Sequence, residues 1–416
     1  MINIVFLTRL SMQNAGNEAL SSELLKLFEN RQDVAVRAFD RYPQYFFKYE
    51  LNSISGVQEQ ELIAKFDNIC TALLNKYSDN DFVLQEHENV VSLNKKGKEL
   101  TGELRKLKQK IALRKRLAKV GLLGKNDVKT VVNTVLKSDQ LIWNPAGEIH
   151  PTGSVDEVFR ILILIRLAQL AGKKTYVINH SLELFDKSLT VILGYVYRNC
   201  NKILVRDHVS VKETAKIGVN NSNVLEVPDA VFLTVDEEGN KAKAKAKGIC
   251  LAINGLEAVH ASEAQWNSFF TRLKKFNKPI YFLSNAMNHD MKFAMQYAQK
   301  YDIQVIEHQP GYKEIQYFYK DFDVLISSRL HSAILALAES VPVVSIEPSV
   351  FKLTSIFDQI NYPLKTVNLN DDSWVDKTIN NVALSLEDSK LFSQVPQNLK
   401  IIKHSVISGY EEMFSS

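Results

Sequence analysis

The segment from Ser327 to His331, SSRLH, brings together two hydroxyls, a guanidinium and an imidazole. It follows an apolar run at 324–327 that predicts a buried strand, and it precedes a predicted helix at 331–339. A helix N-terminus attracts a negative group, the guanidinium fork matches a carboxylate or phosphate, and histidine titrates near neutral pH. The segment therefore predicts an anion site with a proton donor beside it. A structural histidine would also fit the pattern.

Arg206 follows a second predicted strand, at 203–205, and precedes a predicted helix at 209–217. Ligands of parallel sheets bind at the carboxyl ends of the strands, so the Arg206 side chain is placed to meet an anion. A surface ion pair between Arg206 and Asp207, with Asp207 as the helix cap, explains the same residues equally well.

The segment from Asn14 to Leu20, NAGNEAL, joins the first predicted strand, at 2–7, to a helix at 17–28. Gly16 would let backbone amides approach a ligand, and the helix N-terminus would favour a negative group there. The structural alternative is that Asn17 caps the helix and Glu18 complements its dipole. Near strand ends in the same half lie three weaker candidates, His150, His180 and His208.

Strands that alternate with helices must position these residues, and this alternation predicts an α/β protein with parallel sheets covered on both faces. Residues 236–247, DEEGNKAKAKAK, have no apolar face and predict a linker. We therefore expect two doubly wound Rossmann-like domains, 1–235 and 248–416, that face a cleft. The last helix, at 398–414, is expected to pack back on the first half.

Charge is unevenly spread along the 416 residues, whose net charge is +4. Residues 95–129 hold thirteen basic and three acidic residues, with leucines at helical spacing, so a basic helical insertion is predicted at about 85–130. It could be a solvated helix or a contact with anionic lipid or an acidic polymer. The segment lacks aromatic residues, which argues against nucleic acid as a partner.

Cysteine usage and hydropathy bear on the compartment. The three cysteines, Cys70, Cys200 and Cys250, form no C-x-x-C pair, which argues against a disulfide framework or a thiolate zinc site. No run of residues resembles a secretory signal or a bilayer-spanning segment. These features predict a soluble protein of a reducing compartment.

Five blocks together resemble the polysaccharide pyruvyl transferase family: NAGNEAL at 14–20, VRDHVS at 205–210, VPDA at 227–230, SRLHSAILAL at 328–337 and VPVVSI at 341–346. The resemblance implies two domains like those of GT-B glycosyltransferases. It also implies transfer of the enolpyruvyl skeleton of phosphoenolpyruvate to two sugar hydroxyls, which forms a cyclic pyruvate ketal and releases phosphate.

The resemblance also implies site residues. Arg329, Leu330 and His331 match the R-L-H segment that the family associates with phosphoenolpyruvate, Arg206 matches the arginine of V-R-D, and Lys352 lies near the family's lysine offset. Donor binding is thus expected from Arg206, Ser328, Arg329, Leu330, His331 and Lys352. His331 is the expected general acid, and Glu18 or Glu148 would accept the hydroxyl proton. Acceptor-side candidates are Asn14, Gly16, Asn17, Asn144 and Glu148.

Two segments depart from the family pattern. Residues 144–148, NPAGE, stand where the family has a glycine-rich turn, and residues 252–255, AING, lack its arginine or proline. These departures leave the acceptor and the donor open.

Two other functions therefore remain. A GT-B glycosyltransferase using a nucleotide-activated sugar could use the same Arg/His cleft, and a non-catalytic scaffold of envelope-polymer assembly could dock through the basic segment. In the transferase interpretation the partners are phosphoenolpyruvate and a glycan or lipid-linked glycan. Cationic side chains neutralise the donor, so neither a metal nor another cofactor is expected. The expected location is the cytoplasm, with residues 95–129 available to contact the inner face of the plasma membrane.

Overall fold

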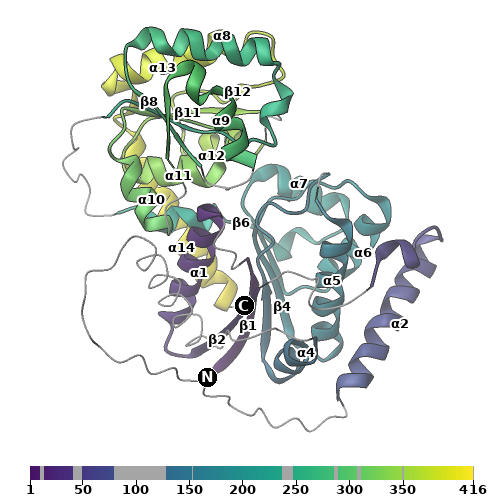
Figure 1. Ribbon diagram of the computed structural model, residues 1–416. Helices are drawn as coiled ribbons and strands as arrows, with labels where there is room; N and C mark the ends of the chain where they lie inside the picture. The colour runs from purple at the N-terminus through teal and green to yellow at the C-terminus, as the bar shows by residue number, and fades with distance from the viewer. Residues whose placement is uncertain are drawn as a thin grey trace, which may run out of the picture.

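The computed structural model describes residues 1–9, 14–40, 49–78, 128–151, 153–236, 247–284, 289–306, 311–348 and 351–415. They form two six-stranded parallel sheets with helices on their faces (Figure 1). The strand orders are β2-β1-β3-β4-β5-β6 and β12-β11-β10-β7-β8-β9. The second order is that of a Rossmann fold. The predicted class, two doubly wound parallel sheets, is confirmed.

The first sheet consists of β1 (Ile2–Thr8), β2 (Val34–Asp40), β3 (Gln140–Trp143), β4 (Lys174–His180), β5 (Lys202–Val205) and β6 (Val224–Glu226). Its helices are α1 (Ala15–Glu29), α2 (Glu59–Ser78), α4 (Val128–Lys137), α5 (Val155–Leu170), α6 (Lys187–Arg198) and α7 (His208–Lys216), with short 3-10 turns η2 (Leu51–Ser53), η3 (Asn221–Asn223) and η4 (Ala230–Thr234).

The second sheet consists of β7 (Ile249–Ala252), β8 (Ile280–Leu283), β9 (Ile303–Ile306), β10 (Val324–Ser327), β11 (Val343–Glu347) and β12 (Val367–Asn368). Its helices are α8 (Glu263–Leu273), α9 (His289–Tyr301), α10 (Tyr312–Tyr319), α11 (Leu330–Ala338), α12 (Lys352–Gln359), α13 (Trp374–Glu387) and α14 (Val395–Ser415), with 3-10 turns η5 (Ala258–His260), η6 (Lys274–Phe276) and η7 (Ser389–Phe392).

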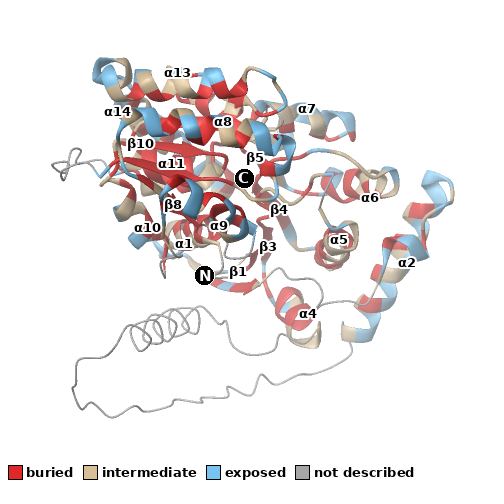
Figure 2. Ribbon diagram, turned by 45° about the horizontal axis from the view of Figure 1, so that its top comes forward, coloured by how far each residue is buried: buried red, intermediate tan, exposed pale blue. Residues whose placement is uncertain are grey.

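Burial follows this layering. Strands β3, β7 and β10 are buried at every residue, as expected for parallel strands covered on both faces. In Figure 2 the exposed residues lie on the outer helices, such as α2 and α13. Helix α5 is apolar nearly all round because α2 covers its outer side: Phe66 packs on Phe159, and Arg166 makes two hydrogen bonds to Asp67 at 2.8 and 3.0 Å.

Helix α14 joins the two halves. It returns from the second sheet to the first, as the sequence predicted, and its Tyr410 and Phe414 rings pack edge-on against Phe28 of α1. One continuous apolar cluster contains Phe6 and Phe28 of the first half together with the core of the second. The two sheets therefore share part of their core.

Two predicted segments fall largely outside the described residues. Only residues 128–130 of the insertion predicted at about 85–130 are described, and they begin α4. Of the predicted linker, only Asp236 and Lys247 are described. Within the described ranges, no helix is both long enough and apolar enough to cross a membrane.

Candidate active site

The site lies where the carboxyl ends of the two sheets meet. Each sheet reverses its strand order at one point, between β1 and β3 in the first and between β7 and β10 in the second, and ligands of such sheets bind at these points. Ser328 follows β10, and its hydroxyl accepts a 2.7 Å hydrogen bond from the backbone N–H of Asn254, just after β7. Arg9 and Asn144 follow β1 and β3.

His331 lies against the first turn of α1. A Cβ atom on Gly16 would stand only 2.3 Å from His331 Nδ1, so the close approach requires glycine. Asn14 caps this helix, because its side chain accepts from the backbone N–H groups of Gly16 and Asn17 at 3.0 and 3.2 Å. The prediction that Asn17 is the cap is wrong. Gly16 makes room for a histidine of the other half.

Asp229 connects the two halves of the site. Its Oδ2 accepts a 2.7 Å hydrogen bond from Arg206 Nη1 and lies 3.5 Å from His331 Nε2. The carboxylate is fully buried, and burial alone would raise its pKa; instead, His331, Arg206 and the backbone N–H of Val231 hold that pKa well below its ordinary range. Asp229 is therefore an ionised carboxylate between the Arg206 guanidinium and the His331 ring.

Arg206 is nearly inaccessible, at 3% exposure, and a second hydrogen bond from its Nε to the Ser181 hydroxyl fixes it at 2.8 Å. The predicted surface pair of Arg206 with Asp207 is wrong. Asp207 does cap α7, as predicted, by accepting from the backbone N–H of Ser210 at 2.8 Å. The sequence indicated that Arg206 faces the cleft but did not reveal its partner.

Two cations from different sheets meet at Gly147. A Cβ atom there would lie 3.2 Å from Arg206 Nη2 and 3.8 Å from Lys352 Nζ. Burial and the nearby Arg206 both lower the pKa of Lys352. Such crowding of positive charge in a buried place is relieved by a bound anion. Glu347 positions Lys352 by accepting hydrogen bonds at 2.9 Å from the backbone N–H groups of Phe351 and Leu353.

Arg329 stands at the start of α11 and forms an ion pair with buried Asp290. Asp290 also accepts from the backbone N–H of Gly255 at 3.0 Å. Among the described residues, Arg329 Nε has no acceptor. Burial raises the pKa of the nearby Glu257 carboxyl, although Lys352 and Arg329 both act to lower it, so Glu257 links these two cations electrostatically.

The two predicted proton acceptors lie in different surroundings. Glu18 faces α10, where burial, with repulsion from Glu314, raises its pKa to about 7 despite a backbone hydrogen bond at Tyr312. Glu148 follows Gly147 and forms a 3.0 Å ion pair with Arg9. Glu148 is thus next to Gly147 in the chain and has its carboxylate on Arg9, whereas the carboxylates whose charge acts on Lys352 are Glu257, Glu183 and Glu347.

Other predicted residues have structural surroundings. Asn144 is buried, donates to the Thr8 hydroxyl at 3.0 Å and accepts from the backbone N–H of Ala146 at 3.1 Å, so it shapes the loop that carries Gly147. Leu330 packs on the apolar cluster at the start of α11.

The three weaker candidates, His150, His180 and His208, differ in their burial and in their distance from the site. His180 is fully buried, its ring nitrogen lies 3.2 Å from the Tyr197 hydroxyl, and burial with the charge of Arg206 lowers its pKa to about 3. His208 is exposed at the start of α7. Burial and Lys352 lower the pKa of His150 to about 4, which places this histidine beside the site as a neutral ring.

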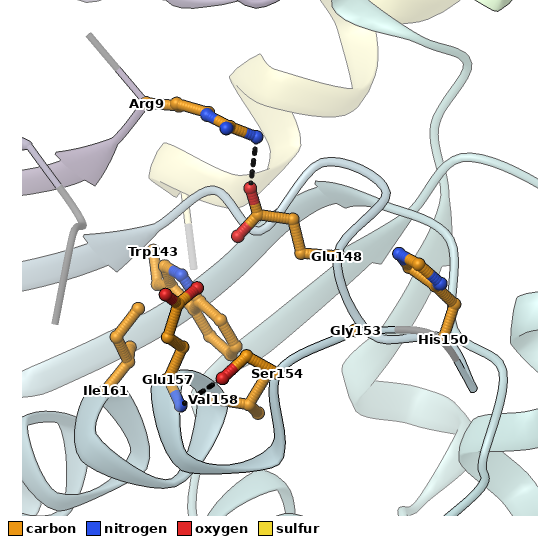
Figure 3. Close-up of a pocket in the computed structure, with 9 residues that line it drawn as sticks. All are labelled: Arg9, Trp143, Glu148, His150, Gly153, Ser154, Glu157, Val158 and Ile161. Atoms are coloured by element: carbon orange, nitrogen blue, oxygen red, sulfur yellow. Dashed lines mark hydrogen bonds and ion pairs between the residues drawn. The ribbon is translucent and has the colours of Figure 1, made fainter. Parts of the chain in front are cut away.

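A cavity of about 180 Å³ opens beside Glu148 (Figure 3). Its lining residues are Arg9, Trp143, Glu148, His150, Gly153, Ser154, Glu157, Val158 and Ile161. Within the part of the chain that the structure describes, no group of three His, Cys, Asp or Glu side chains is arranged to hold a metal ion.

Sequence reasoning missed Asp229, Gly147, Asp290 and this cavity. Asp229 was visible only as part of VPDA, although a charged residue that follows an apolar strand at a sheet's carboxyl end is a usable signal. The cavity combines residues 9 and 143–161, which only the fold brings together.

The family model described as polysaccharide pyruvyl transferase matches residues 14–349. Similar folds include TarM (13% identity, TM-score 0.56, covering 100% of this chain and 99% of that one). The UDP-GlcNAc 2-epimerase of Neisseria meningitidis bound to UDP-GlcNAc is 10% identical, with a TM-score of 0.53 and full coverage of both chains. The MnaA–UDP structure of S. aureus is 9% identical, with a TM-score of 0.52, and the match covers 100% of this chain and 97% of that one. None of the curated proteins matches the chain. At these identities the likeness shows the fold alone, which is the predicted GT-B-like arrangement.

Proposed function

The chain belongs to the polysaccharide pyruvyl transferase family, and from this premise we propose that it forms a pyruvate ketal on a sugar of a cell-surface polysaccharide or its lipid-linked precursor, with phosphoenolpyruvate as donor. The observation that carries the proposal is the meeting of Arg206 and Lys352 at Gly147. Phosphoenolpyruvate bears a carboxylate and a phosphate and needs several fixed cations. Arg329, linked to Lys352 through Glu257, supplies a third.

The donor-binding residues in this proposal are Arg206, Ser328, Arg329, Leu330, His331 and Lys352. Leu330 acts by packing, since it fixes the start of α11. The cations neutralise the donor, so the proposed reaction uses no metal or other cofactor.

The reaction consumes two sugar hydroxyls. The first adds to the enol carbon while the methylene carbon gains a proton and becomes a methyl group. The second hydroxyl then attacks the same carbon, the bond to the phosphate oxygen breaks, and the hydroxyl proton leaves with the phosphate. The positive charge that develops on the central carbon is shared with the oxygen already attached.

His331 is the proposed general acid, because histidine exchanges protons at working pH and this ring lies at the meeting point of the sheets. Asp229 holds the ring from the Nε2 side, at 3.5 Å. We assign the proton acceptor to Glu148, which adjoins Gly147, and keep Glu18 as the second candidate. Asn14, Gly16, Asn17 and Asn144 then shape the acceptor side through the helix cap, the His331 contact and the loop.

A second function has one observation in its favour. Two similar folds are described with UDP or UDP-GlcNAc bound, and the cations at Gly147 would equally suit a nucleotide diphosphate. In that case the protein would be a glycosyltransferase acting in envelope polysaccharide synthesis.

Calorimetry with phosphoenolpyruvate tests the donor. Wild type is expected to bind it, Arg329→Ala to lose binding, and His331→Ala to bind without releasing phosphate when a glycan acceptor is present. Arg272→Ala is the matched control, because Arg272 pairs with exposed Asp376 on outer helices. Binding of a UDP-sugar in place of phosphoenolpyruvate, lost in Arg329→Ala, would establish the second function.

We also propose a cytoplasmic location with residues 95–129 touching the inner face of the plasma membrane. Anionic liposomes should retain the protein at low salt and release it at high salt, because salt screens contacts between basic residues and lipid headgroups. Equal retention on neutral liposomes would overturn this assignment.

A further inference from the structure

We propose that the cavity beside Glu148 is a subsite for one neutral sugar ring of the acceptor. This inference rests on the proposed function, and it specifies the chemistry of the acceptor that the site would take.

The cavity is assembled from three elements. Arg9 follows β1, Trp143 ends β3, and the first turns of α5 contribute Glu157 and Val158 (Figure 3). In Figure 3 these side chains surround one hollow, with Arg9 and Glu148 pointing toward each other. The volume of about 180 Å³ is below the roughly 300 Å³ at which pockets for drug-sized ligands begin, so the space suits a single ring.

Trp143 supplies the signal that a polar ligand is missing. The residue is completely buried, yet its indole Nε1–H has no hydrogen-bond acceptor among the described residues. Buried donors are normally paired, and Trp143, unlike Trp374 with its similarly unpaired Nε1–H, lines a cavity in which a ligand would supply an acceptor. A sugar hydroxyl oxygen is such an acceptor. Val158 and Ile161 provide an apolar wall for the C–H face of the ring.

Charge selects the kind of sugar. Among the described residues that line the cavity, one guanidinium, from Arg9, stands against two carboxylates, from Glu148 and Glu157, and the low pKa of His150 leaves that ring uncharged at neutral pH. The excess negative charge repels a uronate or a phosphorylated sugar, whereas neutral hydroxyls can donate to the carboxylates. We therefore expect a neutral hexose or N-acetylhexosamine.

The position of the cavity relative to the proposed donor site suits transfer of the enolpyruvyl group to a bound sugar. Glu148 lines the cavity, and a Cβ atom on its neighbour Gly147 would lie 3.2 Å from Arg206 Nη2 and 3.8 Å from Lys352 Nζ. A sugar in the cavity would lie on one side of this turn and the anionic donor on the other. Glu148 would then be within reach of a hydroxyl that faces the donor.

Saturation-transfer NMR with methyl galactopyranoside, methyl N-acetylglucosaminide and methyl glucuronide, with and without phosphoenolpyruvate, tests the subsite. A neutral glycoside is expected to bind wild type about tenfold more tightly than the glucuronide, which corresponds to one charged contact. Trp143→Phe, which keeps the ring but removes the N–H, should weaken neutral binding about tenfold, the size of one hydrogen bond. Glu157→Gln should reduce the preference over the glucuronide.

Trp374→Phe is the matched control, because Trp374 is also buried, its Nε1–H also has no acceptor among the residues that the structure describes, and it does not line the cavity. Thermal unfolding identifies any variant that fails to fold, and Glu157→Gln replaces Trp143→Phe in that case. Failure of every glycoside to bind wild type, or binding unchanged in both variants, would overturn the subsite. Cavity-dependent glycoside binding without phosphoenolpyruvate binding would support the subsite and overturn only the donor.

Discussion

At the scale of single residues, Asp229 is the side chain on which the two halves of the site depend. It is fully buried, bonds Arg206 and faces His331. Among the described residues, neither the Arg206 guanidinium nor the His331 ring has a second carboxylate within ion-pair distance. Removing the charge therefore affects binding, proton transfer and stability together.

Asp229→Asn keeps the shape and removes the charge. Because a buried cation loses its counter-ion, we expect the free energy of unfolding to fall by about 3–5 kcal/mol. Turnover should fall by about tenfold to a hundredfold, because His331 loses the group that orients it. Urea unfolding and steady-state kinetics measure the two effects, and His404→Asn, on α14, controls for substitution as such.

The pKa of Asp229 is depressed in the folded state, so its contribution is present above the unfolded pKa of about 3.9 and is lost as pH falls through the folded value. The stability gap between wild type and Asp229→Asn should therefore narrow below about pH 4. A gap that stays constant down to pH 2 would contradict an ionised Asp229.

The pKa of Glu18 is shifted in the opposite direction to that of Asp229, so its effect on stability has the opposite dependence on pH. Its folded pKa of about 7 lies above the ordinary value of 4.5, so folding favours the protonated form and stability falls as pH rises between these values. Glu18→Gln should be more stable than wild type at pH 8 and about equal below pH 4.5. Urea unfolding at both pH values measures this, with Glu29→Gln as control.

The same variant distinguishes the two proton acceptors. Comparing turnover of Glu18→Gln with that of Glu148→Gln tests our assignment, which expects the larger loss from Glu148→Gln. If Glu18→Gln removes turnover and Glu148→Gln does not, Glu18 is the base.

At the scale of elements, the N-terminus of α1 packs against the His331 ring and fixes its position. Gly16→Ala would put a Cβ atom 2.3 Å from the imidazole. Overpacking of this kind costs about 1–3 kcal/mol, and the displaced ring should lower turnover more than it changes phosphoenolpyruvate affinity. The double variant Gly16→Ala with His331→Ala should recover the stability but not the turnover. Non-recovery would show that the contact is not the cause.

Sequence patterns predicted most of the elements that carry the site, because short buried strands followed by amphipathic helices leave a regular signal. They did not predict β2, α2, α4, β12 or α13, nor α12, whose first residue is Lys352. Helix α5 shows why the packing was not predicted. Apolar residues lie on most of its sides, and the side that α2 covers also carries Arg166, so the hydrophobic period does not identify that side as buried. The cap of α1 was placed three residues late because two asparagines, Asn14 and Asn17, satisfy the same rule.

Among the residues of the cleft, some were predicted from the sequence and others were not. Arg206, Arg329 and His331 were predicted from strand-end positions, which topology brings to one edge. Their counter-ions, Asp229 and Asp290, could not be assigned, since pairing depends on how the two halves meet.

At the scale of the whole molecule, the shared core around Phe28, Tyr410 and η4 couples the two sheets. We expect them to unfold together in urea. Trp143→Phe leaves tryptophan fluorescence only in the second half, whereas Trp266→Phe with Trp374→Phe leaves it only in the first. Coincident midpoints are expected after correction for each variant's stability, and two separate midpoints would contradict coupling.

The three buried cysteines are built-in probes of local opening. Cys70 lies in α2, Cys200 follows α6 and Cys250 lies in β7, and all are free. Burial raises the pKa of each thiol, to about 12 for Cys200, so the closed protein should barely react with an alkylating reagent at neutral pH. Each alkylation rate therefore reports how often its own layer opens. Mass spectrometry of the three peptides, with and without phosphoenolpyruvate, would give the alkylation rate of each cysteine. The three rates would report the opening of the outer helix and of each sheet in the wild-type protein.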